Sequence, residues 1–419
     1  MHMKTRTLRT LATGAFAAFL VSTAALSAAD WPQWRGPNRD DVSKETGLLK
    51  SWPEGGPKQL WVFKGAGLGY SGYSISGGRL FTMGIRNGGE ELIAVNTKEG
   101  KELWSARIGS ILKNNWGDGP RGTPTVDGGF VYALGGQGTL ICASAADGKI
   151  AWQKTMQEFG GETPGWGYTE SVLVDGNRVV CTPGGRDGAI VALDKKTGAT
   201  LWQSKEFTDG AQYSSIIAEN LNGARQYIQL TMQHVVGLNA ADGKVLWSVD
   251  FPGKTAVIPT PIFQDGQVYV TAGYGVGCLS FKVGAGNAIE KLYENKVMKN
   301  HHGGAILVNG HVYGHSDGAG WTCQNFKTGE EVWSEKSALG KGAVAYADGR
   351  LYCLAENNGT VVLAEASPKG WKEHGRFKLE PQTTQRNPQG RIWTHPVIVD
   401  GRLFLRDQEL LHCYDVKAR

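Results

Sequence analysis

The sequence lacks the features that mark several large classes of protein. Neither charge is in clear excess, because 44 Lys and Arg face 39 Asp and Glu, and the chain has no Lys/Arg cluster or tail. We therefore expect no nucleic-acid partner. No apolar run is long enough to span a bilayer, and no long helical period appears, which argues against a multidomain α/β fold. With 41 % hydrophobic residues, the chain can still build a core.

Residues 1–29 have the three parts of a secretory signal. Lys4, Arg6 and Arg9 form a basic region, residues 11–21 form a short apolar stretch, and small residues precede a cleavage site before Asp30. The alternative is a buried N-terminal helix. We expect removal of residues 1–29 and a soluble protein that is periplasmic or secreted. The cleavage site holds no Cys, which disfavours a lipid anchor.

Glycine, in contrast, is abundant, with 60 copies, and it recurs in turns between short apolar segments. Two examples are Val126-Asp-Gly-Gly-Phe-Val-Tyr132 and Val399-Asp-Gly-Arg-Leu-Phe404. Asp-Gly and Asn-Gly between apolar runs are strong hairpin signals because both turn positions need a positive φ. Eight such segments begin at residues 76, 126, 174, 222, 264, 308, 347 and 399.

A second motif alternates with the first. Its best copy is Ala192-Leu-Asp-Lys-Lys-Thr-Gly198-Ala-Thr-Leu-Trp202, and related copies end at or near residues 61, 104, 152, 247, 293, 333 and 371. The period of about 45 residues holds four short strands and is typical of a propeller blade.

The repeats predict an all-β protein, a single eight-bladed β-propeller of four-stranded antiparallel blades over residues 59–419. The last unit supplies three strands, so the N-terminal strand 59–63 is expected to close the last blade and hide its edge. Residues 30–58 form a Trp/Pro-rich arm, expected to run across the outside of the propeller and pack Trp31, Trp34 and Trp52 against a blade. A partner-binding arm is the alternative.

The motif at residues 192–202 resembles the tryptophan-docking repeat of the pyrroloquinoline-quinone (PQQ)-like β-propellers, in the quinoprotein alcohol dehydrogenase-like superfamily. The segment Asp30-Trp-Pro-Gln-Trp-Arg-Gly-Pro-Asn38 is similar to the opening of such quinoproteins and of secreted PQQ-like propellers. The resemblance implies that the repeat residues are structural, the tryptophans packing between blades and the glycine turning the strand: Trp104, Trp152, Trp202, Trp247, Trp333 and Gly198.

Two functions are implied by this resemblance. One is a dehydrogenase that holds PQQ and calcium at the propeller centre and oxidises a small alcohol or sugar. The other is a scaffold, such as the propeller lipoprotein of the outer-membrane β-barrel assembly machinery. Many alcohol-oxidising members stack PQQ on a disulfide between adjacent cysteines, whereas this chain has no Cys-Cys pair and no haem-attachment Cys-x-x-Cys-His. We therefore expect a non-catalytic binding scaffold with no cofactor, the dehydrogenase being the alternative. A polysaccharide-binding or hydrolysing propeller is a third candidate.

The six cysteines are expected to be free and buried rather than paired. In the aligned repeats, Cys142, Cys278, Cys323 and Cys413 stand where sister blades carry Ala94, Ala192 and Gly237, while Cys181 and Cys353 share another strand position. A residue that exchanges with Ala and Gly acts as a small buried hydrophobe.

A binding site is expected at the central funnel of one face, here called the top face. There the loops that enter the inner strands lie beside the loops between second and third strands. The candidate residues are Tyr73, Arg121, Glu170, Tyr213, His302, His315, Lys341, Arg391, Trp393 and His395. Cations and aromatic rings would suit a small, flat, anionic ligand or a protein partner. The alternative is a rim that is polar because it faces water.

Catalytic and metal signals are weaker. Asp317 and Asp187 are candidate general bases, without support from a motif. His301 and His302 are adjacent on an extended segment and should point to opposite sides, and no calcium-loop spacing is present. We expect no bound metal and a monomer.

Overall fold

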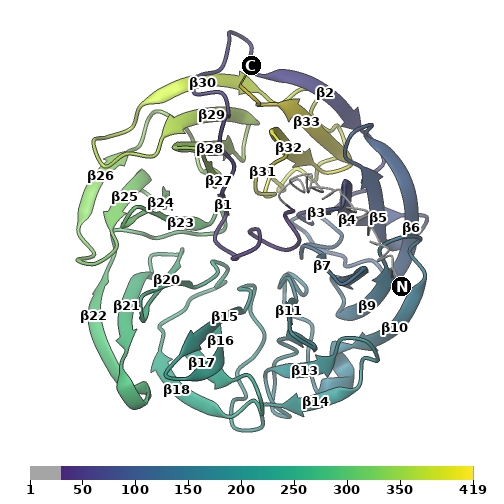
Figure 1. Ribbon diagram of the computed structural model, residues 1–419, viewed down its shortest axis with the longest axis vertical. Coiled ribbons are helices and arrows are strands. Elements are labelled where there is room, and N and C mark those ends of the chain that lie inside the picture. Colours follow the sequence, from purple (N-terminus) through teal and green to yellow (C-terminus); the bar gives the residue numbers. More distant parts are fainter. Residues whose placement is uncertain (1–29, 419) are drawn as a thin grey trace, which may run out of the picture.

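The computed structural model describes residues 30–418; the expected signal at residues 1–29 lies outside the described residues. Eight β-sheets surround a central axis, and chain order follows the ring (Figure 1). The chain forms an eight-bladed β-propeller of antiparallel four-stranded blades, as the repeats predict. The described residues include no helix long and apolar enough to cross a membrane.

Blades 1 to 4 each take four consecutive strands, with one short 3-10 helix after blade 2. Their bounds are β3 (Ser74–Ser76), β4 (Arg79–Arg86), β5 (Gly89–Asn96) and β6 (Lys101–Gly109); β7 (Thr125–Asp127), β8 (Phe130–Leu134), β9 (Thr139–Ser144), β10 (Ile150–Thr155) and η1 (Met156–Phe159); β11 (Leu173–Asp175), β12 (Arg178–Cys181), β13 (Val191–Asp194) and β14 (Thr200–Gln203); and β15 (Ile217–Leu221), β16 (Ala224–Leu230), β17 (His234–Asn239) and β18 (Val245–Asp250).

Blades 5 to 8 continue the pattern, and the last two also recruit N-terminal strands. Their bounds are β19 (Ile262–Gln264), β20 (Gln267–Ala272), β21 (Gly277–Val283), η2 (Ala285–Asn287) and β22 (Ile289–Asn295); β23 (Ala305–Val308), β24 (His311–Ser316), β25 (Gly320–Asn325) and β26 (Glu331–Glu335); β1 (Val42–Ser43) with β27 (Gly342–Ala347), β28 (Arg350–Ala355), β29 (Thr360–Glu365) and β30 (Glu373–Lys378); and β31 (Val397–Val399), β32 (Arg402–Asp407) and β33 (Leu410–Asp415) with β2 (Lys58–Phe63).

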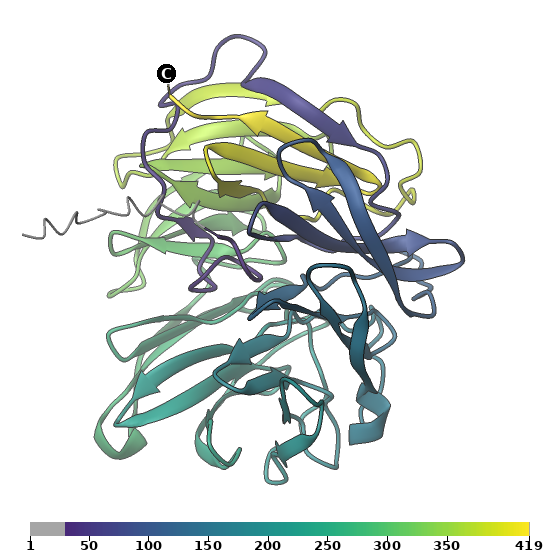
Figure 2. The ribbon, with the colours of Figure 1, turned by 45° about the vertical axis from the view of Figure 1, so that its right-hand side comes forward.

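The ring closes through the predicted N-terminal strand. β2 pairs antiparallel with β33, so the fourth strand of blade 8 comes from the opposite end of the chain. Figure 2 shows β2 lying along the C-terminal sheet. This closure covers an edge that would otherwise expose unpaired backbone groups.

The repeat tryptophans join neighbouring blades. The Trp104 indole donates to the Ala145 carbonyl at 3.3 Å and Trp152 donates to the Lys195 carbonyl at 3.0 Å, each in the next blade. A Cβ on Gly148 would lie 2.5 Å from the Trp104 ring, so the turn glycine is needed where the ring lies against it. Trp247 departs from the pattern, since its indole donates to Gln226 of its own blade at 2.8 Å.

Two repeat alignments made from the sequence are wrong. In blade 5, Tyr293 pairs with Ser280 rather than with Cys278, which lies opposite Asn295. In blade 7, Arg376 pairs with Val362, so Gly375 takes the register position that the tryptophan holds elsewhere, and Trp371 precedes β30. Both blades carry degenerate copies of the motif, so the sequence offered little to fix their register.

All six cysteines are buried and free, as predicted. Three of them lie directly opposite a repeat tryptophan: Cys142 opposite Trp152, Cys323 opposite Trp333, and Cys413 opposite Trp61. The small side chain leaves room beneath the indole, which is why Ala94 and Ala192 occupy the same place in other blades.

Candidate functional site

The N-terminal arm enters the central channel, contrary to the prediction that it runs across the outside. Figures 1 and 2 both show the purple segment leaving the rim beside β2 and turning at the centre of the ring. The backbone of Trp31 exchanges two hydrogen bonds with Ile75 of blade 1, and the Pro32 carbonyl accepts from Val126 of blade 2. Only the later part of the arm crosses a blade on the outside, where Trp52 packs against Tyr352 and Phe377.

Arg39 ties the arm to blades 3 and 4. Its guanidinium is buried and donates to the backbone carbonyls of Ile216 at 2.7 Å, Ser171 at 3.0 Å and Val172 at 2.6 Å. Burial lowers the pKa of Arg39 to about 10, partly offset by the negative charge of Glu170. A buried arginine needs its donors satisfied, and three carbonyls just before the inner strands β11 and β15 accept from it here.

Arg35 and Asp41 tie the arm to blades 6, 7 and 8. Arg35 donates to the Ala305 carbonyl at 2.6 Å and forms an ion pair with Asp41 at 3.0 Å. Asp41 also lies 3.0 Å from Nδ1 of His395, and its carbonyl accepts from Tyr346 at 2.9 Å.

Trp34 ties the arm to blade 5. Its indole donates to the Thr260 hydroxyl at 2.9 Å, and its ring lies 4.6 Å from the His395 ring. The segment Trp31–Ser43, here called the hub, thus contacts the inner strand, or the loop leading into it, of all eight blades. Arg35, Arg39 and Asp41 have φ values of 61°, 57° and 58°. This left-handed conformation costs about 1–2 kcal/mol per residue, which the hub contacts offset.

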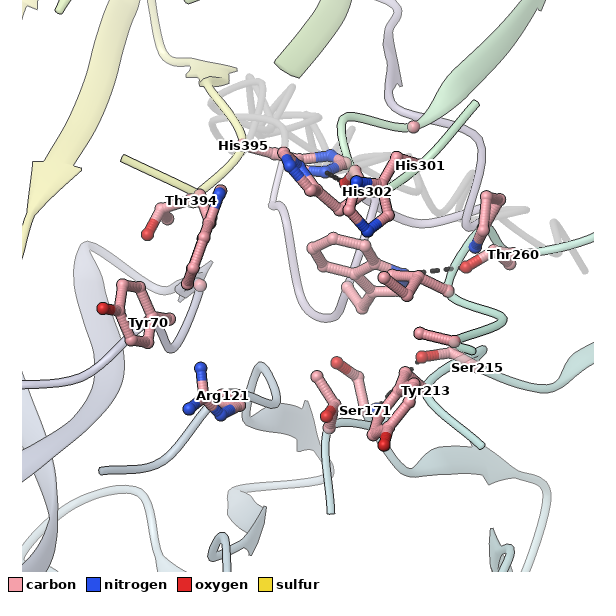
Figure 3. Close-up of a pocket in the computed structure, with 18 of the residues that line it drawn as sticks. Tyr70, Arg121, Ser171, Tyr213, Ser215, Thr260, His301, His302, Thr394 and His395 are labelled. Carbon is pink, nitrogen blue, oxygen red and sulfur yellow. Dashed lines mark hydrogen bonds between the residues drawn. The ribbon is translucent and has the colours of Figure 1, made fainter. Parts of the chain in front are cut away.

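A pocket of about 210 Å³ opens at the centre of the top face, and the hub closes its other end. Its wall consists mainly of aromatic and imidazole rings from the funnel loops (Figure 3). The lining residues that carry rings are Trp34, Tyr70, Trp116, Trp166, Tyr213, Tyr274, His301, His302, Trp393 and His395. Trp34 forms its floor, since it is the hub residue whose ring lies among the wall residues Thr260 and His395.

The acid–base groups at the rim are paired with one another. His302 lies 2.7 Å from Glu356, and Lys341 lies 2.8 Å from Asp317 and 2.7 Å from Nδ1 of His301. Burial and the neighbouring His302 and Lys341 lower the pKa of His301, so its ring is neutral and accepts from Lys341. Burial alone would raise the pKa of Glu356, but the hydrogen bond and charge of His302 hold it below its usual range.

Five of the ten sequence-predicted funnel residues line this pocket: Arg121, Tyr213, His302, Trp393 and His395. The other five lie outside its wall. Tyr73 is buried, and its hydroxyl donates a hydrogen bond to the Phe404 carbonyl. Arg391 donates hydrogen bonds to the carbonyls of Pro388 and Gly390 beside a separate hollow. Lys341 contacts Nδ1 of His301, which lines the pocket, but does not line it itself.

The remaining two are held within the blades. Glu170 is buried and accepts from the backbone N–H and hydroxyl of Thr182; burial raises its pKa to about 7 despite these bonds and Arg39. His315 lies edge-on to Trp321, and burial lowers its pKa to about 4. Of the two candidate bases, Asp317 is paired with Lys341, while Asp187 lies against Gly160 on a blade 3 loop.

Sequence reasoning missed several wall residues, namely Trp34, Trp116, Trp166, Thr260 and Tyr274. Trp34 was assigned to an outer arm because its contacts, Thr260 and His395, lie more than 200 residues away in the sequence. Trp116 and Trp166 lie in loops that the repeat alignment does not cover, so only their residue type was a signal.

The family described as outer membrane protein assembly factor BamB matches residues 88–335, more than half of the 419 residues. The chain belongs to this family of PQQ-like β-propellers. It is similar to the BamB of Kangiella koreensis, with 29 % identity over 46 % of this chain and 45 % of that protein. It is also similar to the tetrathionate hydrolase of Acidithiobacillus ferrooxidans, with 24 % identity over 52 % of this chain and 44 % of that protein. The matches therefore span less than half the length of these curated relatives.

Two solved structures share the fold. The crystal structure of BamB from Moraxella catarrhalis superposes with a TM-score of 0.59 and 15 % identity, covering 86 % of this chain and 98 % of that one. The quinohemoprotein alcohol dehydrogenase of Comamonas testosteroni superposes with a TM-score of 0.62 and 11 % identity, covering 93 % of this chain and 81 % of that one. At these identities the likeness concerns the fold and leaves the activity open.

The pocket residues do not fit PQQ with calcium. Calcium needs several oxygen ligands, but the carboxylates nearest the pocket are engaged by His302, Lys341 and Thr182. No cluster of three or more potential metal ligands occurs within residues 30–418. PQQ carries three carboxylates on a flat tricycle, whereas Arg121 is the one lining cation of the described chain whose charge is not already engaged in an ion pair.

Proposed function

We propose that this protein is an exported, non-catalytic binding propeller that captures a ligand or partner group in the pocket on its top face. The observation that carries the proposal is the state of the acid–base groups around the pocket. His302, His395 and Lys341 each face a carboxylate, Glu356, Asp41 and Asp317 respectively. A general base works best with a pKa near the operating pH, and the hydrogen bond and charge of His302 hold the pKa of Glu356 below its usual range.

The shape of the centre supports the same proposal. The hub lies in the channel and presents the Trp34 ring to the pocket, and hydrogen bonds from Trp34, Arg35 and Arg39 to the blades hold it in place. A rigid ring-lined wall loses little entropy on binding. Export of the chain rests on residues 1–29 and on its BamB relatives, whose name places them in outer-membrane protein assembly.

A dye-linked oxidation assay tests this proposal. Residues 30–419 would be purified, supplied with PQQ and calcium, and offered a panel of alcohols and aldoses. The proposal predicts rates equal to those of the same mixture without protein. Saturable turnover that requires PQQ would overturn it and establish a dehydrogenase.

A further inference from the structure

Arg121 brings a cation without an anionic partner into the pocket. Its Nη2 donates to the Gly117 carbonyl at 2.7 Å, while its Nε is buried without a hydrogen-bond partner. Within residues 30–418 no carboxylate lies at ion-pair distance from it. Two acids act on it from further away and are engaged elsewhere: Asp118 pairs with Lys113 at 2.7 Å, and Glu90 accepts from two backbone N–H groups.

The surroundings of this guanidinium make an anion the natural occupant. Burial lowers the pKa of Arg121, so the cation gains when an anion replaces lost water. The guanidinium lies 4.9 Å from the centre of the Tyr70 ring, and Figure 3 shows Arg121 beside Tyr70 in the pocket wall. A planar guanidinium binds a carboxylate through two parallel hydrogen bonds.

Flat apolar surfaces face the same space. Tyr70 lies 4.8 Å from Trp393, and Tyr213 lies 5.7 Å from Trp166. With the Trp34 floor, these rings offer stacking and edge-to-face contacts to a planar ligand. The volume of about 210 Å³ is below the roughly 300–1,000 Å³ of sites for drug-sized ligands, which favours a ligand of one ring.

The wall consists mainly of rings, and three of its hydroxyl groups already accept a hydrogen bond from the protein, which argues against a sugar acid. Ser171 accepts from the Thr123 N–H at 2.8 Å, Ser215 accepts from the Ser171 N–H at 3.0 Å, and Thr260 accepts from Trp34 at 2.9 Å. A polyhydroxylated ligand would lose its bonds to water without enough replacements.

We propose that the pocket recognises a carboxylate carried on a single aromatic ring, with Arg121 binding the carboxylate and Tyr70, Trp393 and Trp34 contacting the ring. This inference rests on the proposed function and names the ligand class of the same pocket. It assigns to the top face a chemical specificity for small aromatic acids.

Calorimetric titration with 4-hydroxybenzoate and with its neutral isostere 4-hydroxybenzamide tests the inference. The acid should bind at least about tenfold more tightly, as expected for a charge-assisted pair in a desolvated site. Arg121→Gln should abolish this preference. Arg391→Gln, a matched change at a funnel loop arginine outside the pocket, should preserve it.

Equal binding of acid and amide by the unaltered protein, or no binding of either, would overturn the inference even if Arg121→Gln failed to fold. Two further probes separate its failure from that of the proposed function. Tighter binding of D-glucuronate, or of tetrathionate, which has no ring, would refute the aromatic-acid class but leave a binding propeller. Chemical conversion of any bound probe would instead refute the non-catalytic function.

Discussion

His395 and Asp41 lie 354 residues apart in the sequence, yet Nδ1 of His395 is 3.0 Å from Oδ2 of Asp41. The other ring nitrogen of His395 lies 3.0 Å from the carbonyl of His302. A carboxylate and a carbonyl can only accept, so His395 is the donor in whichever contact its ring N–H faces. This contact connects the hub with the funnel loops of blades 6 and 8, and thereby the floor of the pocket with its rim.

Asp41→Asn should destabilise the protein by about 3–5 kcal/mol. The change removes the buried charge that Arg35 and His395 share, and an unpartnered buried cation is costly. Chemical denaturation measures the effect. Lys154→Gln, which breaks an exposed pair with Glu158 at 2.9 Å, should cost at most about 0.5 kcal/mol. Equal losses in both variants would show that the hub contributes no more than a surface contact.

Gly148→Ala should destabilise blade docking more than Gly128→Ala does. Both glycines have positive φ, 75° and 54°, but a Cβ on Gly148 meets the Trp104 ring at 2.5 Å whereas nothing lies within 4 Å of one on Gly128. An alanine in the left-handed conformation costs about 1–2 kcal/mol at either position. Overpacking against the Trp104 ring adds about 1–3 kcal/mol at Gly148. Thermal unfolding of the two variants gives the difference; identical melting temperatures would contradict the docking role of Trp104.

The six thiols should be unreactive in the native protein. All of them are buried, and burial raises the pKa of Cys142 to about 11 and of Cys413 to about 12, which keeps the nucleophilic thiolate rare. A thiol-disulfide exchange reagent should titrate no thiol in buffer and six in denaturant. A fast-reacting thiol in the folded protein would contradict the structure.

His412 should make the protein less stable in acid. Burial lowers its pKa to about 4, from about 6.5 in the unfolded chain. Between these values the unfolded chain binds the extra proton, so stability falls as the pH drops from about 6.5 to about 4. Over this pH range, the loss in free energy of unfolding that His412 causes is on the order of 3 kcal/mol.

His412→Phe should remove this part of the pH dependence. Phe can keep the stacking on Tyr414, and Gln59 retains its bonds to Glu380 and Tyr414. The free energy of unfolding would be measured from pH 7 to pH 4 for both proteins, with His311→Gln at the start of β24 as control. An unchanged pH dependence in His412→Phe would contradict the burial of a neutral imidazole.

The fold could be predicted from the sequence because its determinants repeat. Eight turn segments and the glycine–tryptophan motif fixed the number of blades and, within one residue, the closing strand β2.

The site was predicted only in part. Side chains in the funnel loops follow no repeat, so Tyr73 was chosen although the neighbouring Tyr70 lines the pocket. The path of the hub depends on hydrogen bonds from Arg35 and Arg39 to distant carbonyls, and local patterns do not reveal such partners.

The most direct test of a non-catalytic pocket is calorimetric titration of the purified protein with PQQ, in the presence and absence of calcium. The carboxylates near the pocket are engaged by protein groups, so the account predicts the same isotherm, or the same lack of heat, in both conditions. A gain in PQQ affinity of about tenfold or more with calcium would contradict it, because the pocket would then contain the oxygen ligands of a quinoprotein centre.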